Sequence, residues 1–161
     1  MGLRIQKAGL EDMEHIGILW EAMVEELRRD IPDLNIMADS KEYFQQFAGV
    51  GVLAGSACVF MAVSADGPEG FVMGQIITPE PPFIPEPYGY IVALFIREGW
   101  RGKGSGKALV RSLSEWFAGR GVRRMELHAY YHEENAVRFW QQLGFHPLGL
   151  RLGSPVKSVI K

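Results

Sequence analysis

The first third of the chain carries apolar residues spaced as on one face of a helix. Five of them recur at intervals of three or four positions: Met13, Ile16, Trp20, Met23 and Leu27. This spacing predicts an amphipathic helix, with a short strand over residues 3–7 before it. A second helix is expected after Asp39, because Glu42 follows three residues later as in a capping box.

The middle of the chain changes to strand-like patterns. Apolar runs over residues 58–64 and 70–78 flank an Asp66-Gly67 turn, which predicts an antiparallel pair. Gly74 indicates a bulge in the second run or a close approach of another segment. A third apolar run covers residues 90–96.

A further helix is predicted after this third run. Its apolar stripe consists of Leu109, Leu113, Trp116 and Phe117. Gly119 and Gly121 follow the stripe, and glycine is the residue that most often ends a helix. We therefore expect the helix to stop there.

Length and composition limit the possible classes of protein. A chain of 161 residues fits one domain over residues 1–161, and a formal charge of −2 gives no sign of a nucleic-acid binder. Cys58 is the only cysteine, so we expect a buried apolar thiol in a reducing cytoplasm and no cysteine metal cluster. The apolar stretch over residues 48–63 is too short and glycine-rich to predict membrane insertion.

Two segments have more than one interpretation. The proline-rich run over residues 79–87 is expected to be stiff and extended, as a recognition arm or as a rigid connection. The C-terminal run over residues 148–160 is expected to complete the same sheet or to pair with a second copy in a homodimer.

The most informative stretch is the glycine-rich turn between the third strand-like run and the following helix. It reads Arg101, Gly102, Lys103, Gly104, Ser105, Gly106 and Lys107. Glycines let backbone N–H groups converge, and a helix start adds unpaired donors and a positive dipole end. The turn therefore predicts a site for a pyrophosphate.

Two common nucleotide-binding motifs do not fit this turn. A phosphate-binding loop of the nucleoside triphosphatases needs Gly where Arg101 lies and Ser or Thr where Ala108 lies, so no hydroxyl is present for Mg²⁺. A dinucleotide fingerprint needs glycine where Lys107 lies.

The pattern that does match is Arg-x-x-Gly-x-Gly, over residues 101–106. A second motif follows over residues 126–145, from Glu-Leu-His-Ala to Leu-Gly-Phe. In this order the two motifs resemble the GNAT superfamily of acetyl-CoA-dependent N-acetyltransferases, and the resemblance covers nearly the whole chain. It implies an α/β fold with a mixed, mostly antiparallel sheet flanked by helices, acetyl-CoA as cosubstrate, and no metal.

The same resemblance implies where the cofactor binds. The glycine turn over residues 101–107 would cradle the pyrophosphate of coenzyme A. The backbone of the fourth strand, at Leu94, Phe95 and Ile96, would align the pantetheine arm and the thioester, since that strand separates from the fifth in this family.

Catalytic residues are harder to assign, because no acidic residue interrupts residues 90–96. In the similar ribosomal-protein acetyltransferases a glutamate in the fifth strand is the base, and His128 occupies that place here. Imidazole is mostly neutral at physiological pH and can accept a proton. The alternative is a polar histidine that only fills the strand face.

Two positions depart from the family pattern. Trp140 replaces the usual tyrosine acid, so Tyr130, Tyr131 or water would protonate the thiolate, or it leaves unaided, and Trp140 would pack against the cofactor. The usual asparagine is Glu133 here. Asn135 is offset and either contacts the cofactor or caps the following helix.

The acceptor is expected to be a primary amine of a small molecule, such as a polyamine or an aminoglycoside, or a peptide N-terminus. Glu25 and Glu26 belong to an acidic face of the first helix that would attract a cation, unless they form only a solvated surface. Tyr90 is a further expected substrate contact. The competing class is a regulatory module that binds coenzyme A without catalysis.

Overall fold

The computed structural model describes residues 2–160, in two compact units that cover residues 2–128 and 129–160. Within the described residues, none of the helices has the length and apolar character that crossing a membrane requires. The expectation of one domain over residues 1–161 stays a prediction.

The first unit is built on one five-stranded sheet, whose strands lie in the order in which they occur along the chain. The strands are β1 (Arg4–Lys7), β2 (Ala57–Ser64), β3 (Gly67–Ile77), β4 (Tyr88–Ile96) and β5 (Met125–Leu127). Every neighbouring pair is antiparallel except β4 and β5, which are parallel. The prediction of a mixed, mostly antiparallel sheet flanked by helices is therefore confirmed.

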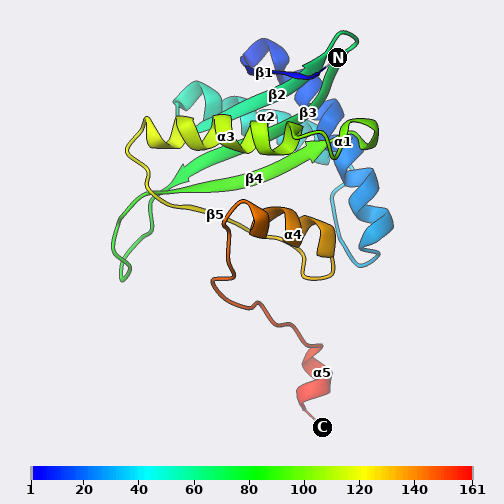
Figure 1. Cartoon of the computed structure of the whole chain (residues 1–161). Helices are drawn as coiled ribbons and strands as arrows, with labels where there is room; N and C mark the ends of the chain where they lie inside the picture. The colour runs from blue at the N-terminus through cyan, green and yellow to red at the C-terminus, as the bar shows by residue number, and fades with distance from the viewer. Residues whose placement is uncertain (1, 161) are drawn as a thin grey trace. The chain divides into compact units, whose positions relative to one another are not determined.

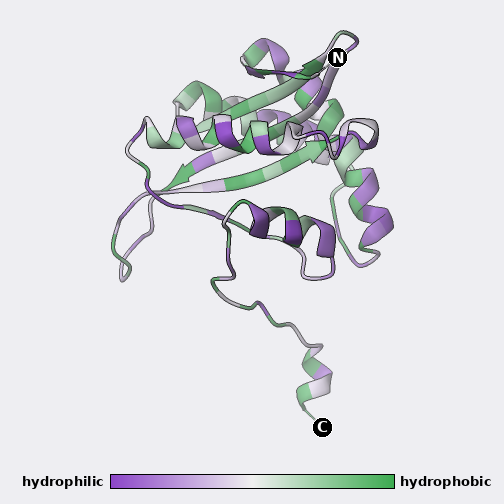
Figure 2. Ribbon diagram, in the orientation of Figure 1, coloured by the Kyte–Doolittle hydropathy of each residue, from purple (hydrophilic) through white to green (hydrophobic). Residues whose placement is uncertain are grey.

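Helices cover both faces of this sheet (Figure 1). They are α1 (Met13–Asp30), α2 (Ser40–Ala54) and α3 (Ser105–Ala118), and short 3₁₀ turns cover Leu10–Asp12 and Glu98–Trp100. The central strands are mostly hydrophobic, as Figure 2 shows, because both of their faces are covered. The sheet is therefore the shared core of two helical layers.

Aromatic residues join α1 and α2 on one face. Trp20 stacks on Phe44 with ring centroids 4.0 Å apart and an 8° angle between the rings, and its indole N–H donates to Ser40. Such a pair contributes about 0.5–1.5 kcal/mol beyond the burial of its area. The helix α2 begins where the sequence predicts, but the predicted side-chain cap is wrong, since the Asp39 side chain makes no capping hydrogen bond.

On the other face, α3 packs closely on two strand glycines. A Cβ at Gly74 would lie 2.7 Å from the Phe117 ring, and one at Gly89 would lie 2.6 Å from the same ring. Gly74 also adjoins the point where the register between β3 and β4 shifts. The close approach predicted for Gly74 is confirmed, whereas the predicted bulge in this strand is wrong, because the extra residue at the register shift is Val92 of β4.

The lone cysteine belongs to this core. Cys58 is fully buried in β2, and burial raises the pKa of its thiol, although Lys7 and Arg120 act in the opposite direction. A protonated, inaccessible thiol is a poor nucleophile. The expectation of a buried apolar residue is confirmed.

In the second unit the described residues form two helices, α4 (Glu134–Gln142) and α5 (Val156–Val159). Residues 146–155 lie in neither a helix nor a strand. Leu148, Leu150 and Leu152 are 68%, 83% and 87% exposed. The prediction that residues 148–160 complete the sheet is therefore wrong for the described residues, because no strand offers this segment a backbone partner.

The close contact of α3 with the sheet predicts opposite outcomes for two glycine substitutions. Gly74→Ala is expected to lower the free energy of unfolding by about 1–3 kcal/mol, because the new methyl overlaps the Phe117 ring and Leu113 in a packed core. Urea unfolding followed by circular dichroism measures the change.

Gly49→Ala in α2 is the matched control. A Cβ there has its nearest neighbours at 3.8 and 3.9 Å, and alanine favours a helix over glycine by roughly 0.5–1 kcal/mol. The control should therefore be neutral or stabilising. Equal stability of the two variants would contradict the packing described for α3.

Candidate functional site

The strand β4 is paired on both sides only along its first part. On the β5 side, the register runs from Gly89 to Ile91, and no residue of β4 after Ile91 has a strand partner there among residues 2–128. The separation coincides with a bulge, since Met73 and Gly74 face Ala93 and Ile91 and leave Val92 as the extra residue.

The parting of the strands leaves a free backbone edge. In an antiparallel pair, alternate residues direct their N–H and C=O groups away from the partner strand. Among residues 2–128, no strand pairs with β4 at Leu94, Phe95 and Ile96 on the side away from β3, although the Ile96 carbonyl oxygen accepts a hydrogen bond from Arg101. These are the three residues at which the family resemblance implies contact with the cofactor.

The glycine turn lies directly after this edge. Gly102 and Gly104 have φ angles of +72° and +84°, and Gly104 is the N-cap of α3. Neither glycine would meet another atom if it carried a Cβ, so the positive φ is what requires glycine here. The first-turn N–H groups of α3 follow at once, and the first turn contains no acidic residue. This geometry suits a bound anion.

The charged side chains of the turn differ in their contacts. Lys103 donates to the Gly99 carbonyl oxygen at 2.8 Å, and its ammonium lies 5.1 Å from the centre of the Trp100 ring. Lys107 is exposed and forms no ion pair with any residue between 2 and 160. The Lys107 ammonium is thus free to approach an anion at the start of α3.

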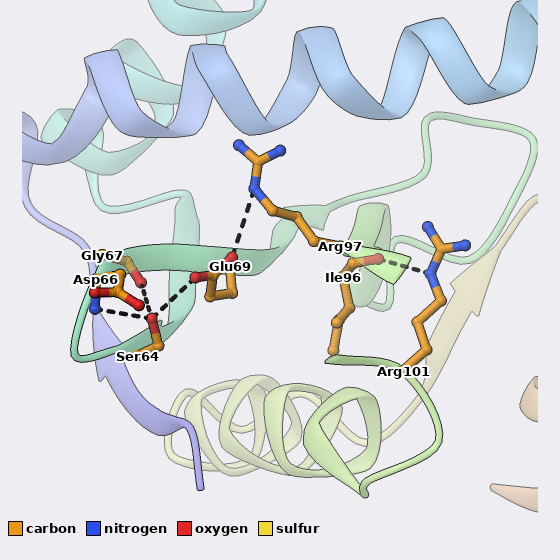
Figure 3. Close-up of polar contacts among 7 residues, drawn as sticks. All are labelled: Ser64, Asp66, Gly67, Glu69, Ile96, Arg97 and Arg101. Carbon is orange, nitrogen blue, oxygen red and sulfur yellow. Dashed lines mark hydrogen bonds and ion pairs between the residues drawn. The ribbon is translucent and has the colours of Figure 1, made fainter. Parts of the chain in front are cut away.

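Arg101 turns back onto the protein, as Figure 3 shows. Its Nε donates to the Ile96 carbonyl oxygen at 2.7 Å, and a terminal nitrogen lies 2.6 Å from a Glu26 carboxylate oxygen. The guanidinium therefore joins the turn to the end of β4 and to α1. In the structure Arg101 shapes the loop, and a direct contact with the cofactor stays a prediction.

A second set of polar contacts fixes the end of β4 to the hairpin between β2 and β3 (Figure 3). The Arg97 N–H donates to the Glu69 carbonyl oxygen at 2.8 Å, and the Arg97 Nε lies 3.6 Å from the Glu69 carboxylate. Ser64 donates to the other carboxylate oxygen at 2.9 Å. These contacts hold the end of β4, after which the chain enters the glycine turn.

Two residues predicted separately come together where β4 and β5 are still paired. The Tyr90 hydroxyl lies 2.6 Å from Nδ1 of His128. His128 follows the last residue of β5, so the expectation that it lies inside the strand is wrong by one residue. The sequence offered no signal for this pair, because the parallel register between distant strands is a tertiary property.

The two acidic residues expected to contact the acceptor have different surroundings. Glu25 is exposed, whereas Glu26 is half-buried and paired with Arg101. On the same helix, Glu21 lies 3.8 Å from the Lys41 ammonium. Part of the predicted negative face is thus already neutralised by cations of the protein.

The second unit contains the remaining predicted residues. Asn135 lies in the first turn of α4, whose N-cap is Glu133, so the prediction that Asn135 caps this helix is wrong. Trp140 packs against Phe139 and Phe145 with ring centroids 5.0 and 5.2 Å apart. Tyr130 and Tyr131 lie beyond the end of β5 and not within it. Contacts of Asn135 and Trp140 with the cofactor stay predictions.

The proline-rich loop before β4 remains open to both interpretations. Phe83 and Ile84 are exposed, and they line a hollow of about 380 Å³ with Pro79, Glu86 and Arg124. Glu86 is paired with Arg123 at 2.8 Å, which ties the loop to the segment before β5.

Comparison with known proteins agrees with this geometry. The family model described as the acetyltransferase (GNAT) family matches residues 20–145. An uncharacterized N-acetyltransferase of Bacillus subtilis, YdgE, is 29% identical over 84 residues, which are 52% of this chain and 54% of that one. The chain thus spans about half the length of this curated relative.

Solved structures share the fold over nearly the whole chain. The tetramutant of the BH1408 protein from Bacillus halodurans has a TM-score of 0.80 and 21% identity, with 95% of this chain and 99% of that chain covered. A predicted acetyltransferase from Clostridium acetobutylicum, solved with acetyl-CoA, has a TM-score of 0.77 and 13% identity, with 97% of each chain covered. At these identities the likeness concerns the fold alone. Since the family model spans most of the sequence, both glycine-turn and fifth-strand motifs included, the chain belongs to the GNAT acetyltransferase family.

Proposed function

We propose that this protein transfers the acetyl group of acetyl-CoA directly to a primary amine, with both substrates bound at once. The proposal rests on the backbone edge of β4 after Ile91, which no strand pairs on the β5 side among residues 2–128. This edge lies between the glycine turn and the Tyr90–His128 pair. The anion-binding turn lies at the end of that edge, and the Tyr90–His128 pair lies where β4 still pairs with β5.

The cofactor follows from the arrangement of this edge. The pyrophosphate of acetyl-CoA binds the N–H groups of the turn over residues 102–107 and the Lys107 ammonium. The pantetheine arm, which carries amides, extends along Leu94, Phe95 and Ile96 as an additional strand would. The backbone of β4 then also donates to the thioester oxygen as that oxygen becomes negative.

The transfer step requires the amine to lose protons. An ammonium has no free lone pair, so one proton first leaves to a base. The nitrogen then attacks the thioester carbon, the C–N bond forms, and the C–S bond breaks. A second proton leaves the nitrogen and ends on the departing sulfur, so that the products are an amide, free coenzyme A and one proton released to water.

His128 is the base in this proposal. Its side chain is exposed, so an acceptor can reach it, and its ring is held at Nδ1. The general acid is left to water or to a tyrosine after β5, since Trp140 replaces the usual tyrosine and indole does not protonate a thiolate.

The proposed class of acceptor is inferred from the carboxylates of α1. Glu25 is an exposed carboxylate that can attract a cationic amine, such as a polyamine, an aminoglycoside or a peptide N-terminus. Glu26 is assigned instead to the turn, because its carboxylate holds Arg101. The cytoplasm as the site of action and a homodimer as the assembly remain predictions.

The glycine turn predicts a cofactor-specific binding defect. Gly104→Ala should weaken binding of acetyl-CoA and coenzyme A by roughly tenfold, because a side chain at a φ of +84° costs about 1–2 kcal/mol and displaces the N–H groups. Thermal shift with acetyl-CoA, coenzyme A and Mg-ATP in parallel measures the effect. Only the first two should stabilise the wild type.

Gly99→Ala is the control for this variant, because a Cβ there meets no atom within 4 Å and the φ angle is not positive. It should bind like the wild type. A wild-type protein that responds to ATP but not to coenzyme A would refute the proposed function.

The assignment of His128 predicts a loss of turnover without a loss of cofactor binding. His128→Ala should lower kcat by about 10²–10⁴-fold at neutral pH and leave the Kd of acetyl-CoA unchanged. The deficit should shrink at high pH, where the free amine forms without a base. Acceptor-dependent release of thiol measures kcat, and calorimetry measures Kd.

His15→Ala, on the exposed surface of α1, serves as the control and should retain full turnover. Turnover of His128→Ala equal to wild type at every pH would exclude His128 as the base. Absence of acceptor-dependent thiol release from the wild type, with coenzyme A still bound, would favour the regulatory module instead.

The different surroundings of two neighbouring carboxylates predict different kinetic defects. Glu25→Gln should raise the KM of a cationic amine several-fold and leave the KM of acetyl-CoA unchanged. Glu26→Gln should change mainly the KM of acetyl-CoA, because it frees Arg101 from α1. Steady-state kinetics with each substrate varied in turn separates the two, with Glu14→Gln in the exposed first turn of α1 as the control. If both variants behaved like the control, both residues would belong to the solvated surface.

A further inference from the structure

Tyr90 and His128 are held together by the pairing of two strands. Tyr90 lies opposite Glu126 in the parallel register of β4 and β5, and His128 is two residues beyond Glu126. The hydroxyl oxygen of Tyr90 is 2.6 Å from Nδ1 of His128, and the ring centroids are 5.7 Å apart at 58°. The distance is short for a neutral hydrogen bond, and the tilted rings leave Nε2 on the far side of the imidazole.

Only one tautomer of His128 can act as a base from this position. A neutral imidazole has one N–H and one free lone pair. If the phenol donates to Nδ1, the proton of the ring is on Nε2, and no lone pair is left for the acceptor. If Nδ1–H donates to the phenol oxygen, Nε2 keeps its lone pair and faces away from Tyr90.

We infer that Tyr90 is a positioning residue, which accepts a hydrogen bond from Nδ1–H of His128 and so keeps Nε2 available to take the proton of the amine. The inference rests on the proposed function, in which His128 is the base. The same hydrogen bond persists after the transfer, because the imidazolium carries a proton on both nitrogens. Tyr90 therefore need not move or ionise during the reaction.

The charged groups near Tyr90 and His128 have other partners, so the Tyr90 phenol is the group that holds Nδ1 of His128. Glu126, opposite Tyr90 on β5, is 3.4 Å from Arg124, and Arg124 also lies over the Tyr88 ring at 5.1 Å. On the other side, β3 places the neutral Gln75 opposite Tyr90. The carboxylate that lies nearest along β5 is thus already paired with a cation. A neutral hydroxyl holds the ring at Nδ1 without adding a charge beside the incoming ammonium.

Nitrogen NMR of the imidazole rings tests the tautomer directly. Protonated and unprotonated ring nitrogens have widely separated ¹⁵N shifts, and the chain has four histidines to resolve. His128→Gln identifies the signals of His128 by their loss. Above the titration of the ring, the wild type should show His128 as the Nδ1–H tautomer, whereas histidine in water favours Nε2–H.

Tyr90→Phe keeps the ring and removes only the hydroxyl. In this variant His128 should revert towards the Nε2–H tautomer, kcat should fall by roughly tenfold, and the Kd of acetyl-CoA should stay unchanged. Tyr88→Phe, on the same strand, is the matched control and should change neither the tautomer nor kcat. A role of Tyr90 in folding alone would not move the tautomer.

Two results would overturn the inference. One is a wild-type His128 in the Nε2–H form, which needs no variant and is independent of folding defects. The other is a Tyr90→Phe protein with unchanged tautomer and kcat. If turnover does not depend on His128 at all, then His128 is not the base and Tyr90 has no role in turnover. The NMR experiment still decides, independently of turnover, whether Nδ1–H of His128 donates to Tyr90.

Discussion

The packing of α3 against two strand glycines is the constraint on which the rest of the site depends. The Phe117 ring lies where side chains at Gly74 and Gly89 would be, so α3 approaches β3 and β4 more closely than larger residues would allow. This contact sets the height and direction of α3 over the sheet. Because the N–H groups that are proposed to bind the anion belong to the first turn of α3, their position relative to the end of β4 follows from packing about three turns away.

Each residue of β4 can either pair with β5 or offer its backbone to a ligand on that side, but it cannot do both. The first residues of β4 pair with β5 and place Tyr90 beside His128, whereas its later residues have no strand partner on that side among residues 2–128. The bulge at Val92 marks the change between the two. A sheet that remained fully paired would be more stable, but it would offer no backbone edge to a pantetheine arm. The open edge is thus a local loss of hydrogen bonding, which the proposed pairing with a pantetheine arm would restore.

Two arginines keep this open edge in place. Arg97 joins the end of β4 to Glu69 of the neighbouring hairpin, and Arg101 returns from the turn to the Ile96 carbonyl oxygen. Both are partly exposed, so each ion pair contributes little to the free energy of unfolding, of the order of 0–1 kcal/mol. Their effect is geometric, because they limit the conformations available to a turn that would otherwise be restrained only by its glycines. Glu26 extends the same restraint to α1.

Local sequence patterns located the helices and the glycine turn that is proposed to bind an anion, because both depend on neighbours within a few residues. Helical spacing located α1 and α3, the positions of Gly102 and Gly104 located the turn, and Gly74 indicated the close packing. The side chains that meet across the fold were not predictable in this way. The side-chain cap by Asp39, the N-cap of α4 by Asn135 and the C-terminal strand were expected from local patterns and are absent from the described structure. Tyr90 and His128 are 38 positions apart, and Arg101 and Glu26 are 75 positions apart. The register of the parallel strands decides the first contact, and the crossing of α1 over the sheet decides the second. Register and crossing both depend on packing over the whole core, so they leave no periodic pattern in the sequence near the residues that meet.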